Sequence, residues 1–196
     1  MASTKSIGVF CGSSPGNHSG FVDLATQTGQ EIAARNHRLV YGGGGTGLMG
    51  AMAKAVLENG GHVLGVIPEF LISTERVFNA VETKVVGNMH ERKMAMFDAS
   101  DAFIILPGGI GTLEEVTEMM SWKRLQLHQK PIVFLANDNY WEPFMELIRH
   151  TIKSKFSPEW IMEDIYSAKS AIQCLDVIEK DWEQPKKASR EIAPVN

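Results

Sequence analysis

The chain of 196 residues carries a formal net charge of −4, and 44% of its residues are hydrophobic. This length and composition suit one globular domain with a sizeable core. The mild acidity, with no basic stripe, argues against nucleic acid or an anionic membrane as a partner. No apolar stretch approaches the roughly 18 residues of a membrane span, and the N-terminus has no signal-peptide pattern. We therefore expect a cytoplasmic protein.

Strand-like and helix-like segments alternate along the chain. The predicted strands are short and apolar, at 6–11, 38–41, 62–67, 81–86, 102–106 and 131–135. The predicted helices have apolar residues at helical spacing, at 21–35, 48–58, 89–99, 113–126, 141–153 and 167–180. Apolar strands between helices are typical of a parallel sheet covered on both faces. We expect a doubly wound, mostly parallel Rossmann-like α/β fold, as a single nucleotide-binding domain over residues 1–180 with a polar tail over 181–196.

Cysteine and histidine give no support for a disulfide framework or a metal site. Cys11 and Cys174 lie far apart and form no CxxC pair. The six histidines have none of the spacings of a metal ligand set, such as HExxH. The sequence therefore predicts no metal ligands.

Three of the predicted strands end in glycine-rich turns, at 11–16, 41–50 and 107–112. In an open parallel sheet, ligands bind outside the carboxyl ends of the strands. Three such turns on that edge favour a nucleotide-sized anion, since glycine lets the backbone approach a ligand closely. The second turn also fits G-x-G-x-x-G, but the acidic residue of a dinucleotide site is absent about 20 residues on. A tight turn that needs small residues only for packing is the alternative.

The third turn reads Pro-Gly-Gly-Ile-Gly-Thr-Leu-Glu-Glu over residues 107–115 and leads into a predicted helix with Thr112 at its N-cap. The unpaired N–H groups and positive dipole end of such a helix suit a phosphate. Glu115 follows one turn later, roughly 5.4 Å along the helix axis. A carboxylate there can act on an atom one sugar ring away from an anchored phosphate. Thr112 and Glu115 also fit a capping box, so a structural role for Glu115 stays open.

Other side chains are candidates for the same site. Arg92 lies near the start of the predicted helix 89–99 and is a fixed cation that can orient a carboxylate or contact a purine edge. A solvated helix start is its alternative. Ser13 follows the first strand and can bind a phosphate or the base, or simply close a turn. Trp122, two helical turns after Glu115, is either core or a wall of the pocket.

Together these segments resemble the LONELY GUY (LOG) family of cytokinin-activating phosphoribohydrolases, which are often mislabelled lysine decarboxylases. The resemblance spans residues 7–153 and is carried by Pro107-Gly108-Gly109-x-Gly111-Thr112-x-x-Glu115, Gly42-Gly43-Gly44-x-x-Gly47-x-Met49-Gly50 and Met89-His90-x-Arg92-Lys93. It implies hydrolysis of the N-glycosidic bond of AMP or N6-prenylated AMP, giving free base and ribose 5-phosphate. It also implies a homodimer and a reaction without a metal or cofactor.

The resemblance implies roles for individual residues. Arg92 and Glu115 are expected to be catalytic, since a carboxylate near C1′ stabilises an oxocarbenium-like state and can take a proton from water. The residues expected to bind substrate are Ser13, Gly43, Gly44, Met89, Lys93, Gly108, Gly109, Gly111 and Thr112. Position 110, often aromatic in plant members, is isoleucine here. The helix 113–126, with Met119, Met120 and Trp122, is either a dimer contact or ordinary core.

Two other functions stay open from the sequence. A non-catalytic nucleotide-binding or carrier protein of the same fold needs the glycine turns but not the pair of Arg92 and Glu115. An amino-acid decarboxylase needs a Schiff-base lysine in a pyridoxal phosphate pocket, and no lysine stands out in such a context. The clustering of the glycines disfavours a purely structural module.

Overall fold

A single parallel sheet organises the chain, for which the computed structural model describes residues 4–74 and 76–185. The strand order is β4-β3-β2-β1-β5-β6-β7, and every neighbouring pair of strands is parallel. The strands are β1 (Ser6–Phe10), β2 (Arg38–Tyr41), β3 (His62–Pro68), β4 (Glu82–Val86), β5 (Ala102–Ile105), β6 (Ile132–Leu135) and β7 (Ile165–Ala168). The predicted parallel α/β fold is confirmed.

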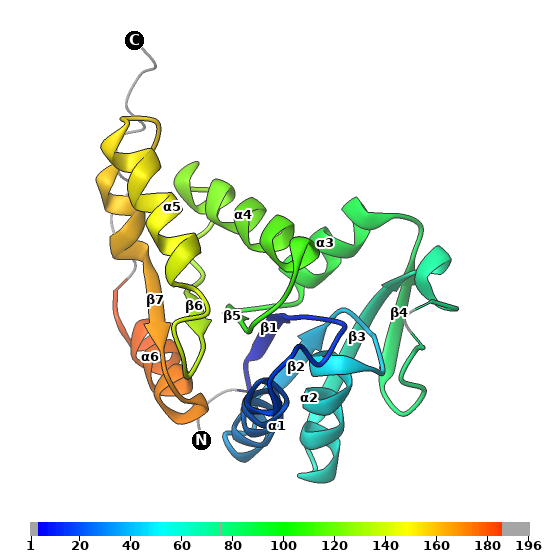
Figure 1. The fold of residues 1–196 in the computed structure, drawn as a ribbon. Coiled ribbons are helices and arrows are strands. Elements are labelled where there is room, and N and C mark those ends of the chain that lie inside the picture. The colour runs from blue at the N-terminus through cyan, green and yellow to red at the C-terminus, as the bar shows by residue number, and fades with distance from the viewer. Residues whose placement is uncertain (1–3, 75, 186–196) are drawn as a thin grey trace.

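Helices cover both faces of this sheet (Figure 1). The α-helices are α1 (Ser19–Ala34), α2 (Gly47–Glu58), α3 (Met89–Asp98), α4 (Ile110–Arg124), α5 (Glu142–Lys153) and α6 (Ala171–Glu183). α1, α2 and α6 pack on one face, and α3, α4 and α5 pack on the other. Two short 3₁₀ helices, Glu69–Leu71 and Glu159–Asp164, follow β3 and precede β7.

Successive side chains of a strand pack alternately into two separate hydrophobic cores, one on each face of the sheet. Ile7 and Val9 of β1 belong to the core beneath α1, α2 and α6, whereas Phe10 belongs to the core beneath α3, α4 and α5. Because successive side chains point to opposite faces, a strand covered on both faces is apolar at every position. All four residues of β5 are fully buried. This double burial is the physical origin of the apolar runs that predict the sheet.

The order of the strands places a crevice beside β1. The chain adds β2, β3 and β4 on one side of β1 and β5, β6 and β7 on the other. At the carboxyl ends of the adjacent strands β1 and β5, Phe10 is aligned with Ile105. The connections leaving these two strands diverge, which opens the ligand-binding crevice of a doubly wound sheet. The glycine turns at 11–16 and 107–112 leave the sheet at this point.

The C-terminal part of the fold differs from the prediction. Ser167 and Ala168, expected in the last helix, instead form part of β7, a four-residue strand at the edge of the sheet. Such a short strand with a polar residue in it carries little sequence signal. α6 begins at Ala171 and continues to Glu183, so 181–183 are helical rather than part of the expected polar tail, and residues 186–196 of that tail lie outside the described residues.

Two features of the described residues concern membranes and metals. None of the helices within 4–74 and 76–185 is long and apolar enough to cross a bilayer. The same ranges contain no group of three or more His, Cys, Asp or Glu side chains placed to hold a metal ion.

Candidate active site

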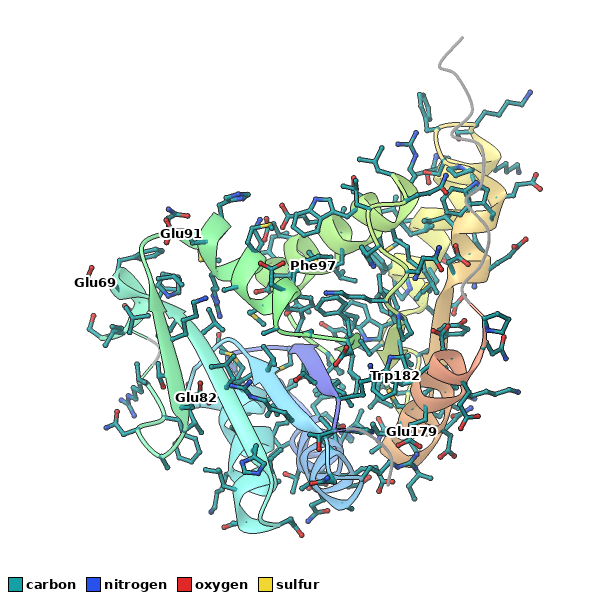
Figure 2. The ribbon with its side chains drawn as sticks, turned by 180° about the vertical axis from the view of Figure 1, so that it is seen from behind. Glu69, Glu82, Glu91, Phe97, Glu179 and Trp182 are labelled. Atoms are coloured by element: carbon teal, nitrogen blue, oxygen red, sulfur yellow. The ribbon has the colours of Figure 1, made fainter. Side chains whose placement is uncertain are left out.

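A cavity of about 350 Å³ lies at the carboxyl edge of the sheet, at the crevice beside β1. A volume of this order is typical of small-ligand sites. The turns after β1, β2 and β5 line it together with α2, α3 and α4, through Val9, Phe10, Cys11, Gly12, Ser13, Gly42, Met49, Leu71, Met89, Arg92, Met96, Gly109, Ile110, Gly111, Thr112 and Glu115. Figure 2 labels Glu69 and Glu91, which are close in sequence to the cavity residues Leu71 and Arg92. They lie on the opposite side of the molecule from Glu179 and Trp182 of α6.

Backbone hydrogen bonds connect the three glycine turns. The N–H of Gly12 donates to the carbonyl of Pro107 at 3.0 Å, and the N–H of Leu48 donates to the carbonyl of Gly12 at 3.2 Å. Gly47 has a φ of +59°, and a Cβ at this position would overlap the backbone of Ser13. Glycine is therefore required where the second turn meets the first. Backbone hydrogen bonds, together with one from the Thr46 hydroxyl to the carbonyl of Ser13 at 3.4 Å, connect the turns.

α4 begins earlier than predicted. Its N-cap is Gly109, with φ −91° and ψ −153°, and Leu113 donates its N–H to the carbonyl of Gly109 at 3.1 Å. Thr112 lies within the first turn, and its Oγ1 occupies the space that a Cβ at Gly108 would need. The prediction of Thr112 as the N-cap is wrong, because glycine is itself an accepted N-cap residue and starts the helix three positions sooner.

The start of α4 forms one wall of the cavity. Gly109, Ile110, Gly111 and Thr112 all line it. The first N–H groups of an α-helix have no acceptor within the helix, and they lie at its positive dipole end, so this wall suits an anion. Glu115 is the sixth residue of the helix, counted from Ile110. A capping box requires the glutamate at the third position after a Ser or Thr N-cap, so that role is excluded.

Arg92 reaches the cavity from α3. It is 5% exposed, its Nη2 donates to the carbonyl of Gly42 at 3.1 Å, and its Nη1 donates to the Sδ of Met89 at 3.8 Å. A Cβ at position 42 would overlap the guanidinium. The absence of a side chain at Gly42 therefore makes room for the cation. The alternative of a solvated helix start does not hold for this arginine.

Glu115 lines the same cavity as Arg92 and is 8% exposed. A carboxylate this buried needs a charged or hydrogen-bonding neighbour in order to stay ionised. Among the described residues that line the cavity, Arg92 is the one cation. The structure therefore brings together, in one cavity, the two side chains that the sequence analysis selects for catalysis.

The predicted binding residues divide into two groups. Those that line the cavity are Ser13, Met89, Gly109, Gly111 and Thr112. Three glycines instead contact neighbouring segments: the carbonyl of Gly43 accepts the N–H of Phe78 at 3.3 Å, Gly44 forms an antiparallel bridge with Val77, and the carbonyl of Gly108 accepts the Tyr140 hydroxyl at 2.6 Å. These three shape the turns around the cavity.

Lys93 is not among the residues that line the cavity. Its Nζ lies 2.5 Å from Glu114 Oε1 and 3.0 Å from Glu118 Oε2, both on α4. Burial opposes the charge on this ammonium, but the hydrogen bonds to Glu114 and Glu118 outweigh it and raise the pKa of Lys93. Lys93 thus contacts α4, and its relation to the site is indirect.

Sequence reasoning gave no binding role to the apolar wall of the cavity. Met49, Met96 and Leu71 line it alongside the predicted residues. The two methionines follow the helical spacing of ordinary core residues, and Leu71 lies in an irregular stretch without periodicity. Tyr140, which anchors Gly108, is 32 residues away in a polar loop. Only a tertiary structure brings these side chains to the site.

The middle of α4 is core. Met119 is fully buried and Met120 is 6% exposed, and both belong to the core beneath α3, α4 and α5. Trp122 packs against the same core and meets the ring of Phe97 edge-on, with centroids 5.1 Å apart. Met119 and Met120 are therefore ordinary core, and none of the three residues lines the cavity, so Trp122 is not a pocket wall. A dimer contact through this helix stays a prediction.

Fold and cavity define a class of protein: a Rossmann-like domain with a cavity at the switch point of its sheet. A family model described as "Possible lysine decarboxylase" matches residues 49–178. The rice (Oryza sativa subsp. japonica) protein "Probable cytokinin riboside 5'-monophosphate phosphoribohydrolase LOGL1" is 45% identical over 96% of this chain and 83% of its own length. "Cytokinin riboside 5'-monophosphate phosphoribohydrolase LOG1" of Arabidopsis thaliana is 43% identical over 89% of this chain and 83% of its own length. The chain belongs to this LOG family, as the sequence resemblance predicts.

Among solved structures, the Moco carrier protein from Chlamydomonas reinhardtii is similar, with a TM-score of 0.69. The match covers 92% of this chain and 98% of the carrier, at 21% sequence identity. At that identity the likeness establishes a shared fold.

Proposed function

We propose that this protein hydrolyses the N-glycosidic bond of AMP or an N6-substituted AMP, releasing the free base and ribose 5-phosphate. The observation that carries the proposal is the convergence of Arg92, Glu115 and the start of α4 on one cavity. Relatives that are 45% and 43% identical are named as phosphoribohydrolases of cytokinin riboside 5′-monophosphates, which supports the same chemistry here.

The 5′-phosphate binds at the start of α4. Gly109, Ile110, Gly111 and Thr112 line that end of the cavity. The first N–H groups of a helix have no acceptor within it, and the helix dipole favours the negative charge. An anchored phosphate holds the ribose in one position, which converts binding energy into orientation at C1′.

Glu115 acts on C1′. Cleavage of the ribosyl–purine bond passes through a state with positive charge on C1′ and the ring oxygen. The carboxylate stabilises this charge and accepts a proton from the attacking water. In a balanced step the bond between C1′ and the base nitrogen breaks, the water oxygen bonds to C1′, and one water proton passes to Glu115. The departing base takes up a proton from solvent and Glu115 returns its proton to solvent, so that one water is divided between the ribose and the base.

Arg92 serves Glu115 and the leaving base. A guanidinium beside the carboxylate favours its ionised form, and the planar fork of donors can hydrogen-bond a purine edge. The hydrogen bond from Arg92 to the Gly42 carbonyl at 3.1 Å fixes the plane of the guanidinium.

The apolar wall receives the base. Met49, Leu71 and Met96 line the cavity, and Ile110 stands at its edge with 83% of its surface exposed. Methionine adapts to flat or irregular apolar ligands. This wall suits the purine ring and an apolar N6 substituent, which favours a prenylated nucleotide over plain AMP.

We also propose that the protein acts as a homodimer in the cytoplasm. Ile110, which lines the cavity, and Phe70, next to the cavity residue Leu71, expose 83% and 60% of their surface, and large apolar side chains left exposed beside a site are candidates for a protein contact. Nucleoside monophosphates are made and kept inside cells, which supports the location. Sedimentation equilibrium of the purified chain tests the dimer, and a mass of one chain at micromolar concentration contradicts it.

The two competing functions fit the cavity less well. A carrier protein of the same fold has no need for a buried carboxylate and a buried arginine in one cavity. A pyridoxal-dependent decarboxylase requires a lysine in the pocket, and the described residues that line the cavity include none.

Product chromatography tests the proposal. Purified protein is incubated with AMP and with isopentenyladenosine 5′-monophosphate, beside Glu115→Ala, Arg92→Ala and, as a matched control, Glu146→Ala on the exposed surface of α5. We expect free base from the wild type and the control, and at least a hundredfold less from the two site variants. Base release at the wild-type rate by either site variant contradicts the assignment, and binding without base release by the wild type favours the carrier.

A further inference from the structure

A charged cluster links α3 to α4 next to the cavity. The Nζ of Lys93 on α3 lies 2.5 Å from Glu114 Oε1 and 3.0 Å from Glu118 Oε2 on α4. Lys93 is 9% exposed as a residue, and the side chains of Glu114 and Glu118 are 53% and 25% exposed. An ammonium with this little exposure is held in place by its two carboxylates, unlike the loosely held partners of a surface ion pair.

The cluster consists of direct neighbours of the proposed catalytic pair. Lys93 follows Arg92 on α3, and Glu114 precedes Glu115 on α4. Consecutive helical residues project about 100° apart, so Lys93 can contact α4 while Arg92 faces the cavity. Glu114 and Glu118 are one turn apart on the same face of α4, and Lys93 contacts both of them.

This arrangement constrains the orientation of α4. In the described structure no side chain caps its first turn, which begins at Gly109. A single contact limits only the distance between two helices. The contact from Lys93 to two successive turns of α4 also limits rotation of the helix about its axis and sliding along it. The direction in which Glu115 points depends on both motions.

The cluster also sets the charge near Glu115. The titratable or charged groups that line the cavity are Arg92, Glu115 and the thiol of Cys11. Behind them, Glu114 and Glu118 add two carboxylates, and the ammonium of Lys93 is paired with both. Removal of that ammonium leaves two uncompensated carboxylates beside Glu115, which disfavours its ionised form.

Resting on the proposed function for the role of Glu115, we infer that Lys93 is a positioning residue for the hydrolysis. It holds α4 through Glu114 and Glu118, keeps the Glu115 carboxylate directed at C1′ and ionised, and makes no contact with the nucleotide. This differs from the sequence-based expectation that Lys93 binds substrate.

Steady-state kinetics of Lys93→Met and Lys93→Arg test the inference. Methionine keeps most of the length and removes the charge, and arginine keeps the charge. We expect Lys93→Met to lower kcat about tenfold, as for a small misplacement of a catalytic group, with KM within about twofold of the wild type. The acidic limb of the kcat–pH profile moves up by about one pH unit. Lys93→Arg is expected to have a kcat and a pH profile close to those of the wild type. A rise in KM with unchanged kcat indicates direct substrate binding and overturns the inference.

A mutant cycle tests whether Lys93 affects activity through Glu114 and Glu118. If Lys93 acts through the two carboxylates, then adding Lys93→Met to Glu114→Gln/Glu118→Gln costs no further activity, because the interaction is already absent. The acidic limb of this triple variant also returns toward the wild-type position, since the uncompensated charges are gone. An additional tenfold loss in the triple variant overturns the inference.

The control is Lys54→Met. Lys54 forms an ion pair with Glu58 at 3.7 Å on α2 and is not a cavity residue, so we expect wild-type kcat and pH profile. Circular dichroism melting checks that each variant is folded. If Lys93→Met does not fold, the single variants Lys93→Arg and Glu118→Gln test the same contact in a folded protein. Absence of base release by the wild type overturns the proposed function, whereas wild-type turnover with an unchanged kcat and pH profile in Lys93→Met overturns only the positioning role.

Discussion

The hydroxyl of Tyr140 donates a hydrogen bond to the carbonyl of Gly108 at 2.6 Å, across 32 residues of sequence. Gly108 directly precedes the N-cap of α4. The next residue, Trp141, donates its Nε1–H to the carbonyl of Ile105 in β5 at 3.1 Å. Two consecutive aromatic residues after β6 thus hold both the end of β5 and the turn that leads to the proposed phosphate site.

Tyr140→Phe removes this one hydroxyl and is expected to raise the KM for the nucleotide about fivefold, with little change in kcat. A hydrogen bond of this kind contributes about 1 kcal/mol, and its loss loosens the turn that presents the N–H groups of α4. The matched control is Tyr166→Phe, which removes a 2.7 Å hydrogen bond to Asp181, away from the cavity. Equal KM values for the two variants contradict the prediction.

Gly42→Ala is expected to lower kcat about a hundredfold while leaving the fold stable. The new Cβ would overlap Arg92 Nη2 and lie 3.1 Å from Met49 Sδ, both at the ends of flexible side chains. The guanidinium must therefore move, and loss of its orientation costs activity. Thermal melting and the product assay measure the two effects. A stable variant with wild-type turnover indicates that Arg92 need not lie against position 42.

Leu71→Ala is expected to change substrate preference. Leu71 lines the cavity, and removal of its apolar surface lowers kcat/KM for isopentenyladenosine 5′-monophosphate about tenfold, since burial of a leucine side chain contributes on the order of 2 kcal/mol. The value for AMP changes by less than threefold. Leu147→Ala, at a 55% exposed position on α5, is the control. Equal losses for both substrates contradict contact between Leu71 and the N6 group.

His128 is expected to make stability depend on pH. Burial lowers the pKa of His128 from 6.5 to about 4, and this outweighs the hydrogen bond to the Met119 carbonyl. Below pH 6.5 the unfolded chain binds a proton that the folded chain excludes, so the free energy of unfolding falls between about pH 6.5 and pH 4 and then levels off. The loss is of the order of 3 kcal/mol.

Urea unfolding at several pH values measures this effect. The loss between pH 6.5 and 4 is expected to be smaller in His128→Gln than in the wild type. His150→Gln, at an exposed position of α5, is the matched control and is expected to follow the wild type. Parallel curves for the wild type and His128→Gln contradict a role for His128.

The sequence predicted the central part of this molecule well, for a physical reason. β5 is buried on both faces, so it appears as an uninterrupted apolar run, with the third glycine turn shortly after it. β7 was missed, because an edge strand of four residues has too few apolar positions to produce such a run. The start of α4 was misplaced, because a glycine N-cap uses no side chain and Thr112 offered a more conventional cap.

In the candidate site too, the sequence identified some residues and did not show the contacts of another. Arg92 and Glu115 were candidates because of their residue types and their places near the starts of two predicted helices, and the family motifs then implied their catalytic roles. Lys93 was assigned to the substrate, since sequence alone does not show that α4 places Glu114 and Glu118 beside it. Contacts between distant segments decide such cases, and no local pattern encodes them.

The pairing of β1 with β5 determines the stage of folding at which the cavity forms. The aligned residues Ile7 and Ala102 are 95 positions apart, and the third glycine turn is bonded to the first, through Pro107 and Gly12, only after these strands meet. Long-range pairing is a slow step in folding. Because neither half of the sheet contains the cavity, a ligand that binds there stabilises the state in which the two halves have joined, rather than either half by itself.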